Sequence, residues 1–251
     1  MIGLLTLTGF IINGNMHKDV AGIELVVYRN AETGFISQSE IMSSLNKIDS
    51  LTIRLESENK LELNKIKTDE IERVLSENPY IDEVDSYLTL DGKLLINIKE
   101  KEPIIRVFDK GKGGFYIDNQ GDIFPVSKLY SPRVIIANGY INEEVNTFNS
   151  NISDTSYDNT VFRELFLLTK LINKNSLLAA QINQIYVNSK GEYDLIPELG
   201  DHLVQLGTLE DIQNKLQNLE AYYRKNLKSS DWDKYKIINL IYKDQIVCTK
   251  K

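Results

Sequence analysis

Residues 93–126 constrain the fold more than any other part of this sequence. Residues 93–100 place apolar side chains on both faces of a predicted β-strand, and a charged run then leads to Pro103. Proline removes a backbone donor and biases the preceding residue toward an extended conformation, so we expect a boundary there. Beyond it, three β-branched and aromatic runs separated by two turn-rich segments predict a three-stranded meander over residues 104–126.

The segment before this stretch predicts one strand and two helices. The apolar run of residues 23–28 is typical of a strand. Ser37 and Glu40 match a capping box, in which each side chain satisfies an orphan backbone donor at the start of a helix. A second helix is expected to open at Thr68, because acidic residues in its first turn favour the helix dipole.

A hairpin completes this first region. Residues 81–90 and 93–100 are expected to pair across Asp91 and Gly92, which are a sequence signal for a type I′ turn. The resulting order over residues 20–102 is β-α-α-β-β, which resembles a POTRA domain, a small sheet with two helices on one face.

The remaining residues, 103–251, are expected to form a mostly antiparallel β domain with two helices, so the whole chain is assigned to the α+β class. Apolar residues recur at three- and four-residue steps from Val161 to Ile172 and from Ile212 to Tyr223, which predicts one helix in each segment. Thr208 is expected to cap the second of these helices. Besides the meander, strands are expected at residues 133–137, 182–188, 193–197, 202–206, 235–242 and 245–249.

Several motifs occur in an order that resembles one bacterial family. They are an E-x-x-P pattern from Glu100 to Pro103, a strand reading F-Y-I-D that ends at Asp118, then Gly121, and the pair Phe124-Pro125. Together they resemble the FtsQ/DivIB cell-division proteins, and in particular the members from Bacteroidetes. The resemblance covers nearly all of the chain. The resemblance implies a POTRA domain followed by an FtsQ-type β domain.

The same resemblance implies a function without catalysis. Members of this family are single-pass proteins of the inner membrane whose bulk lies in the periplasm, where they act as divisome scaffolds during septum formation. The implied partners are FtsB/DivIC-like and FtsL-like division proteins and, with them, the septal peptidoglycan synthase complex. A short N-terminal anchor and the absence of a tail after the last expected strand are departures from the family pattern.

The N-terminal residues 1–12 are apolar and uncharged, but as a helix they would span only roughly 18 Å. A bilayer core requires about 20 residues, and no basic segment precedes the apolar run as it would in a signal peptide. Two interpretations remain open: a disordered or buried tail, and the outer half of a membrane anchor. We favour the second, with residues 1–19 as a partial anchor and linker.

Composition and the reactive residue types argue against an enzyme. The formal net charge of −7 disfavours nucleic-acid binding, which depends on basic patches. His17 falls in a linker, and His202 is expected on the surface of a strand rather than as a catalytic base. The single cysteine, Cys248, lies in a terminal strand without a neighbour that would activate it. No cofactor, metal ion or small-molecule substrate is therefore expected.

Two further clusters have simple structural interpretations. The glycines around Gly113 join two strands, so they predict a hairpin turn rather than a phosphate-binding loop, which would join a strand to a helix. The acidic residues Asp82, Glu83 and Asp85 could coordinate a cation, but acids on a strand usually face water.

A binding surface is the remaining kind of functional site, and the last strand is the best candidate for it. If nothing later in the chain pairs with this strand, one of its sides presents free backbone groups that can accept a strand from a partner. In the FtsQ family the final strands receive the FtsB/DivIC partner, and the preceding strand ends in a D-x-R-Y-like pattern of which this sequence keeps only Tyr242. The predicted partner-binding residues are Tyr242, Lys243, Asp244, Ile246, Val247 and Cys248.

Three alternatives remain open at this point. Tyr242 could pack inside the β domain instead of anchoring a partner. The protein could be a POTRA-type assembly factor or chaperone for outer-membrane or secreted proteins, although such proteins carry tandem POTRA copies or a barrel. A deep pocket that holds two carboxyl groups with raised pKa values would instead indicate an enzyme.

Overall fold

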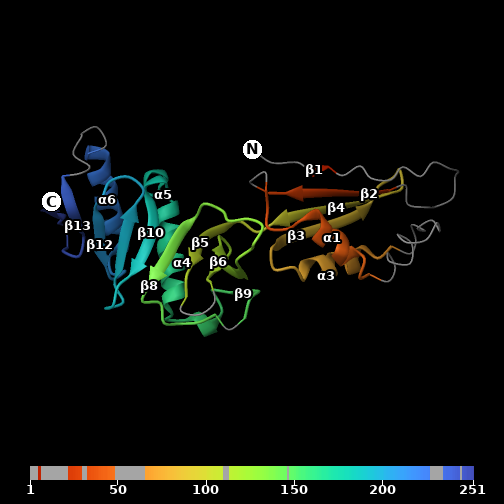
Figure 1. Cartoon of the computed structure of the whole chain (residues 1–251), viewed down its shortest axis with the longest axis horizontal. Helices are drawn as coiled ribbons and strands as arrows, with labels where there is room; N and C mark the ends of the chain where they lie inside the picture. The colour runs from red at the N-terminus through yellow and green to blue at the C-terminus, as the bar shows by residue number, and fades with distance from the viewer. Residues whose placement is uncertain are drawn as a thin grey trace. The chain divides into compact units, whose positions relative to one another are not determined.

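The computed structural model describes residues 5–6, 22–29, 33–48, 66–109, 113–145, 147–226, 234–243 and 245–251 (Figure 1). The chain divides into two compact units, one of residues 1–102 with 127–131 and the other of residues 103–126 with 132–251. No helix in the described ranges is long and apolar enough to cross a membrane. Of the expected anchor, only strand β1 (Leu5–Thr6) is described, so the anchor stays a prediction.

The first unit contains a four-stranded sheet in the order β1-β2-β4-β3. Strand β2 (Gly22–Tyr28) runs parallel to β4 (Lys93–Glu100), while β3 (Ile81–Leu88) is antiparallel to β4 and β1 is antiparallel to β2. Two helices, α1 (Gln38–Leu45) and α3 (Thr68–Ser76), follow β2 in the chain. The predicted β-α-α-β-β order is therefore confirmed, with β1 as an additional strand.

The core of this unit follows from the alternation of side chains along β4. Leu94, Ile96 and Ile98 are fully buried, as are Ile41 and Leu45 of α1 and Ile71 and Leu75 of α3, so one face of the sheet is covered by the helices (Figure 1). The capping box is present: the Glu40 N–H donates to the Ser37 hydroxyl, and the Glu40 carboxylate accepts from the Ser37 N–H.

The type I′ prediction for the β3–β4 turn is wrong. Such a turn needs a positive φ at both central residues, but of Asp91 and Gly92 only the glycine has one, at 84°. The Thr89 N–H donates to the Lys93 carbonyl at 2.8 Å, so residues 90–92 form a three-residue loop that ends in a left-handed glycine.

The second unit contains one ten-stranded sheet in the order β14-β13-β12-β11-β10-β8-β5-β6-β7-β9. Most neighbouring strands are antiparallel, but β8 is parallel to both β5 and β10, and β12 is parallel to β13. The strands are β5 (Pro103–Val107), β6 (Phe115–Asp118), β7 (Asp122–Pro125), β8 (Ile135–Gly139), β9 (Ser150–Asn151), β10 (Ile182–Val187), β11 (Tyr193–Pro197), β12 (Leu203–Gly207), β13 (Tyr235–Asn239) and β14 (Val247–Lys250).

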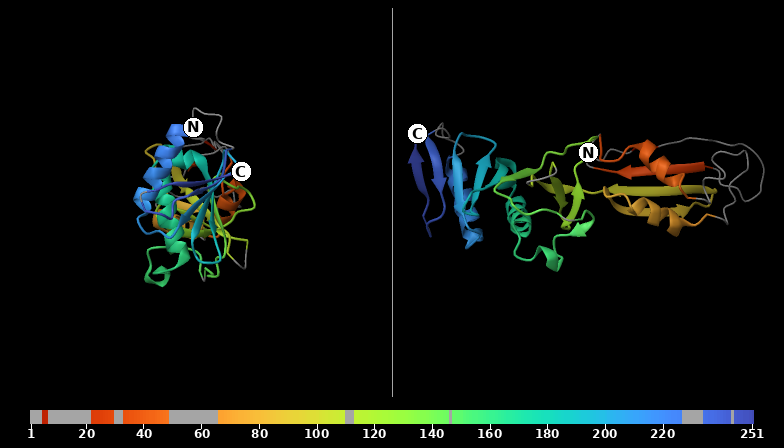
Figure 2. Two further views of the ribbon diagram at one scale, coloured as in Figure 1. Left: turned by 90° about the vertical axis from the view of Figure 1, so that its left-hand side faces the viewer. Right: turned by 60° about the horizontal axis from the view of Figure 1, so that its bottom comes forward.

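Helices cover one face of this sheet (Figure 2). In the described residues they are α4 (Val161–Asn173), α5 (Ser176–Gln181) and α6 (Ile212–Asn226), with a short 3₁₀ helix at Thr155–Tyr157. Leu165 and Leu168 of α4 and Leu219 and Tyr223 of α6 are fully buried in the same core as the strand residues Ile185 and Leu195. The predicted meander and the two apolar stripes are thus confirmed.

Two features of the helices differ from the expectation. Helix α5 was not expected, although Asn175 caps it by accepting the N–H groups of Leu177 and Leu178. The expected cap at Thr208 is wrong: α6 begins at Ile212, because Asp211, with a φ of 53°, is not in a helical conformation.

The E-x-x-P pattern has a clear structural role in the first unit. Glu100, only 3% exposed, accepts the N–H groups of Phe35 at 3.0 Å and Ile36 at 3.3 Å. The Arg29 guanidinium lies 3.7 Å from the same carboxylate. A Cβ atom at Gly34 would overlap the Glu100 carboxylate, so any larger residue there would displace the carboxylate from its N–H partners. Pro103 is the first residue of β5, so the pattern runs from this buried carboxylate to the start of the second unit.

The substitution Glu100→Ala is expected to lower the free energy of unfolding by about 1–3 kcal/mol, because it leaves buried N–H groups without an acceptor. Chemical denaturation measures the effect. Glu102→Ala is the matched control, since Glu102 is exposed two residues away, and it should change stability by less than about 0.5 kcal/mol. Equal effects of the two substitutions would contradict this role.

Stability should also depend on pH through the same group. Burial raises the pKa of Glu100 above its ordinary 4.5, while the Phe35 and Ile36 N–H groups and Arg29 oppose the shift. The folded state then keeps the proton to a higher pH than the unfolded state, so this contribution to stability falls as the pH rises from 4.5 through the raised pKa. Denaturation at a series of pH values should show the fall in the native protein but not in Glu100→Ala; parallel pH profiles would refute it.

Candidate functional site

Strand β14 is the terminal strand of the ten-stranded sheet. It pairs with β13 on one side, and in the described part of the chain no strand pairs with its other side. The last strand was expected to offer such an edge, and the structure places it there. Its ability to bind a partner stays a prediction.

The hydrogen-bond pattern of β13 shows which backbone groups of β14 point outward. The Leu240 N–H donates to the carbonyl of Gln205 in β12 at 2.9 Å, so the preceding residue, Asn239, directs its backbone groups toward β14. Asn239 lies opposite Val247, and Lys251, further along, donates its N–H to the Lys234 carbonyl at 3.2 Å.

Because backbone groups alternate along a strand, Val247 and Thr249 point their N–H and C=O groups at β13. Cys248 and Lys250 therefore direct theirs away from the sheet. These two residues provide the backbone donors and acceptors that an added strand would use.

The side chains of β14 divide between the two faces of the sheet. Ile246 and Cys248 pack against the main core, and burial raises the pKa of the Cys248 thiol, although a hydrogen bond with Tyr222 of α6 offsets part of that shift. Cys248 is therefore a packing residue rather than a nucleophile. Val247 lies on the opposite face and is 43% exposed, and Thr249 is exposed beside it.

Tyr242 lies in the turn after β13, not in the strand, so the expected strand over residues 235–242 is too long. β13 ends at Asn239 because its side-chain carbonyl accepts the Ile241 N–H at 2.8 Å, which turns the chain locally. Tyr242 is 58% exposed, and the neighbouring Ile241 is also exposed. The alternative in which Tyr242 packs inside the β domain is therefore wrong.

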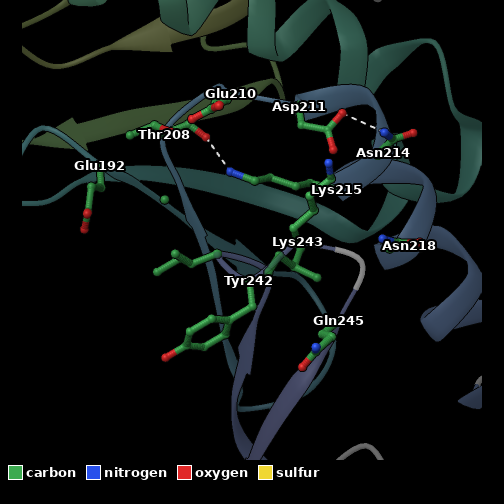
Figure 3. Close-up of a pocket in the computed structure, with 13 residues that line it drawn as sticks. Glu192, Thr208, Glu210, Asp211, Asn214, Lys215, Asn218, Tyr242, Lys243 and Gln245 are labelled. Atoms are coloured by element: carbon green, nitrogen blue, oxygen red, sulfur yellow. Dashed lines mark hydrogen bonds between the residues drawn. The ribbon is translucent and has the colours of Figure 1, made fainter.

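A cavity of about 430 Å³ lies beside this turn (Figure 3). Lys215 of α6 contributes one wall and donates to the carbonyls of Leu206 at 3.0 Å and Thr208 at 2.8 Å. Burial lowers the pKa of the Lys215 amine, while Glu210 and Asp211 oppose that shift. Figure 3 shows the Tyr242 ring pointing away from the α6 residues, so it is presented to solvent at the rim of the cavity.

The structure brings most of the predicted residues together. Tyr242 and Lys243 line the cavity, and Ile246, Val247 and Cys248 lie in or next to β14, while Asp244 lies outside the described residues. Sequence reasoning missed Ile241, Gln245 and Lys215, which line the same cavity. Asn239 carried a usable signal, since an asparagine at the end of an apolar run often starts a turn.

The other residues considered from the sequence have structural explanations. His202 is not on the surface: it is buried, and its Nε2 lies 3.0 Å from the Tyr223 hydroxyl. The Lys99 ammonium of β4 lies 2.7 Å from Asp82 and 3.0 Å from Glu83 of the neighbouring strand β3, so both acids are ion-paired. No cluster that could hold a metal ion occurs among the described residues.

Among the described residues, burial raises the pKa of one carboxyl group in each unit. Glu100 belongs to the first unit, and Asp194 belongs to the second unit, where Glu192 adds to the effect of burial. Neither lines the cavity beside Tyr242.

Models of known protein families match the sequences of both units. A model described as a POTRA-like domain matches residues 20–99, which defines the class of the first unit. A model described as FtsQ/DivIB, C-terminal related, matches residues 102–249. The chain therefore belongs to this FtsQ/DivIB-related family, with a POTRA-like domain before a strand-rich domain. A search of curated proteins found no match.

This family defines a general role. FtsQ/DivIB-type proteins are division proteins that interact with other division proteins, and they are generally not enzymes. The comparisons thus support a role as a cell-division scaffold, and they do not identify a specific partner.

Substitution at two neighbouring positions tests the geometry of this turn. Tyr242→Ala should change the free energy of unfolding by less than about 0.5 kcal/mol, because its ring is mostly in solvent. Leu240→Ala should cost about 2–5 kcal/mol, because Leu240 is 2% exposed and belongs to the core. Chemical denaturation of both variants checks this, and a large loss in Tyr242→Ala would show that the ring is a core residue.

Proposed function

We propose that this protein is a non-catalytic scaffold of the divisome that binds other membrane-anchored division proteins by strand addition at β14. Through these partners it helps to control septal peptidoglycan synthesis. The observation that carries the proposal is the terminal position of β14, whose Cys248 and Lys250 backbone groups point away from β13. The family membership supports the cellular role.

The proposed partner is an FtsB/DivIC-like protein, itself paired with an FtsL-like protein. A segment of it would extend the sheet beyond β14, so that backbone hydrogen bonds supply affinity and alternate side chains supply specificity. Exposed Tyr242 would act as an aromatic anchor next to the added strand, because a large ring that is already in solvent gains most from being covered.

Charge adds a selective element. Lys243 and Lys250 are exposed at this end of the sheet, and Lys251 contacts Asp201 at 3.3 Å. Edge lysines disfavour indiscriminate pairing with neutral strands, and a partner segment with acidic residues would complement them. This local positive charge contrasts with the formal net charge of −7 for the whole chain.

The proposed location is the inner membrane, with a single N-terminal anchor and the two described units in the periplasm. Reaction of cysteine with a membrane-impermeant thiol reagent, applied to intact cells with a permeable outer membrane, tests this placement. An exposed position such as Thr249→Cys, combined with Cys248→Ala, should be labelled without lysis. Labelling only after lysis would place the sheet on the other side of the membrane.

A proline scan of β14 tests strand addition. Lys250→Pro removes a backbone N–H that points away from β13, so the domain should remain folded. Partner binding should weaken about tenfold or more. One such hydrogen bond contributes about 0.5–1.5 kcal/mol, and the proline ring also obstructs the added strand. Calorimetric titration with the extracytoplasmic segment of the FtsB/DivIC-like protein measures the affinity.

Two controls make the result specific. Lys250→Ala keeps the N–H and separates the loss of the ammonium group from the loss of the backbone donor. Val247→Pro removes a donor that faces β13, so it should destabilise the β13–β14 pairing itself and is not a clean test of the outer edge. Unchanged affinity in a folded Lys250→Pro protein would exclude strand addition at β14.

The alternative is a POTRA-type assembly factor for outer-membrane or secreted proteins, which the match of the first unit to a POTRA-like domain favours. Such a factor would bind unfolded β-strand peptides through the first unit. Binding of these peptides that persists in Lys250→Pro and in a protein ending at Tyr242 would favour this alternative.

A further inference from the structure

Strand β3 lies at one end of the four-stranded sheet of the first unit, and it is longer than β14. Strand β3 has eight residues and pairs only with β4 in the described part of the chain. A long terminal strand readily pairs with other chains unless its outer side is covered or interrupted.

A carboxylate from α3 occupies the middle of this outer side. The Ser86 N–H donates to Glu72 Oε1 at 2.9 Å and so points away from β4. The Ser86 hydroxyl lies 3.1 Å from the same Glu72 oxygen and 3.2 Å from the Thr68 carbonyl. Ser86 is only 6% exposed, so these bonds are shielded from water.

The residues two positions away on either side share the orientation of Ser86. Backbone groups alternate along a strand, so Val84 and Leu88 also direct their N–H and C=O groups outward. The Glu72 carboxylate therefore stands between two stretches of edge that could otherwise form one continuous ladder with another strand.

We propose that Glu72 closes the β3 edge and that the edge, when opened, pairs with β3 of a second copy of this chain. In an antiparallel pair centred on Ser86, each Val84 would lie opposite Leu88 of the second copy, and each Asp85 opposite Tyr87. No acid then faces an acid across the pair, and a two-fold axis satisfies the outward groups of both chains at once.

In the native protein, the same arrangement is blocked. The two Glu72 carboxylates would meet at the two-fold axis, where each already holds the N–H that the ladder needs. The two edges therefore differ: in the described part of the chain no group pairs with the outer side of β14, whereas the Glu72 carboxylate holds the outer side of β3. This inference stands independently of what β14 binds.

The experiment compares two variants of the full chain, Glu72→Ala and Glu70→Ala. The second is the matched control, because it makes the same chemical change two residues earlier in α3. Sedimentation equilibrium over a range of protein concentrations should show that Glu72→Ala self-associates at least tenfold more tightly than the native protein. Glu70→Ala should behave as the native protein does. A folded Glu72→Ala protein that self-associates no more than the native one would overturn the proposal.

Amide hydrogen exchange identifies the edge that pairs. In Glu72→Ala, protection of Val84, Ser86 and Leu88 should rise with protein concentration, while that of Cys248 and Lys250 should not. The opposite pattern would assign the association to β14 and overturn the proposal.

A measurement on the native protein keeps the test valid if Glu72→Ala fails to fold. At low concentration the Ser86 amide should exchange at least tenfold more slowly than the amides of Val84 and Leu88, because Glu72 holds it. Equal exchange rates for the three amides would show that Glu72 does not close the edge.

Discussion

Every β-strand has two rows of backbone donors and acceptors, and the strand at the end of a sheet satisfies only one of them. This constraint explains the most informative features of both units. The ten-stranded sheet ends at β14 with the backbone groups of Cys248 and Lys250 directed outward, whereas the four-stranded sheet ends at β3 with Ser86 bonded to Glu72. In the described part of the chain the outer side of β14 thus has no strand partner, whereas the Ser86 N–H on the outer side of β3 is bonded within its own unit.

The rest of the second unit supports the open edge. Tyr223 and Leu219 of α6 are buried in the core, and Tyr222 of the same helix contacts Cys248, so α6 supports β14 from one face of the sheet. Asn239 ends β13 and directs the chain into the turn that presents Tyr242. In this arrangement a packed layer positions the strand and the turn that carries Tyr242, which would reduce the ordering cost of binding a partner.

Local rules predicted much of the fold from the sequence. The Ser37–Glu40 capping box, the start of α3 at Thr68 and the apolar stripes of α4 and α6 were confirmed, because each depends on residues only a few positions apart. The type I′ turn failed for a subtler reason, since Asp91 keeps a negative φ while Gly92 alone takes the left-handed conformation. His202 was misplaced because nothing near it in the sequence reveals Tyr223, its buried partner 21 residues later.

The candidate site was only partly predictable for the same reason. The last expected strand was predicted to lie at the edge of its sheet, and β14 is the terminal strand of the ten-stranded sheet. The phase of that strand was not predictable, because it depends on the register with β13, and it is this phase that selects Cys248 and Lys250 rather than Val247. Glu72 was equally inaccessible, since its role requires α3 to lie beside β3.

Amide hydrogen exchange at β14 measures the central claim most directly, without altering the protein. The protein is compared alone and with a saturating amount of the extracytoplasmic segment of the FtsB/DivIC-like protein. The account predicts that exchange of the Cys248 and Lys250 amides slows by tenfold or more on binding, while Val247 and Thr249, already bonded to β13, change little. Binding that leaves the Cys248 and Lys250 amides as fast as before would contradict the account.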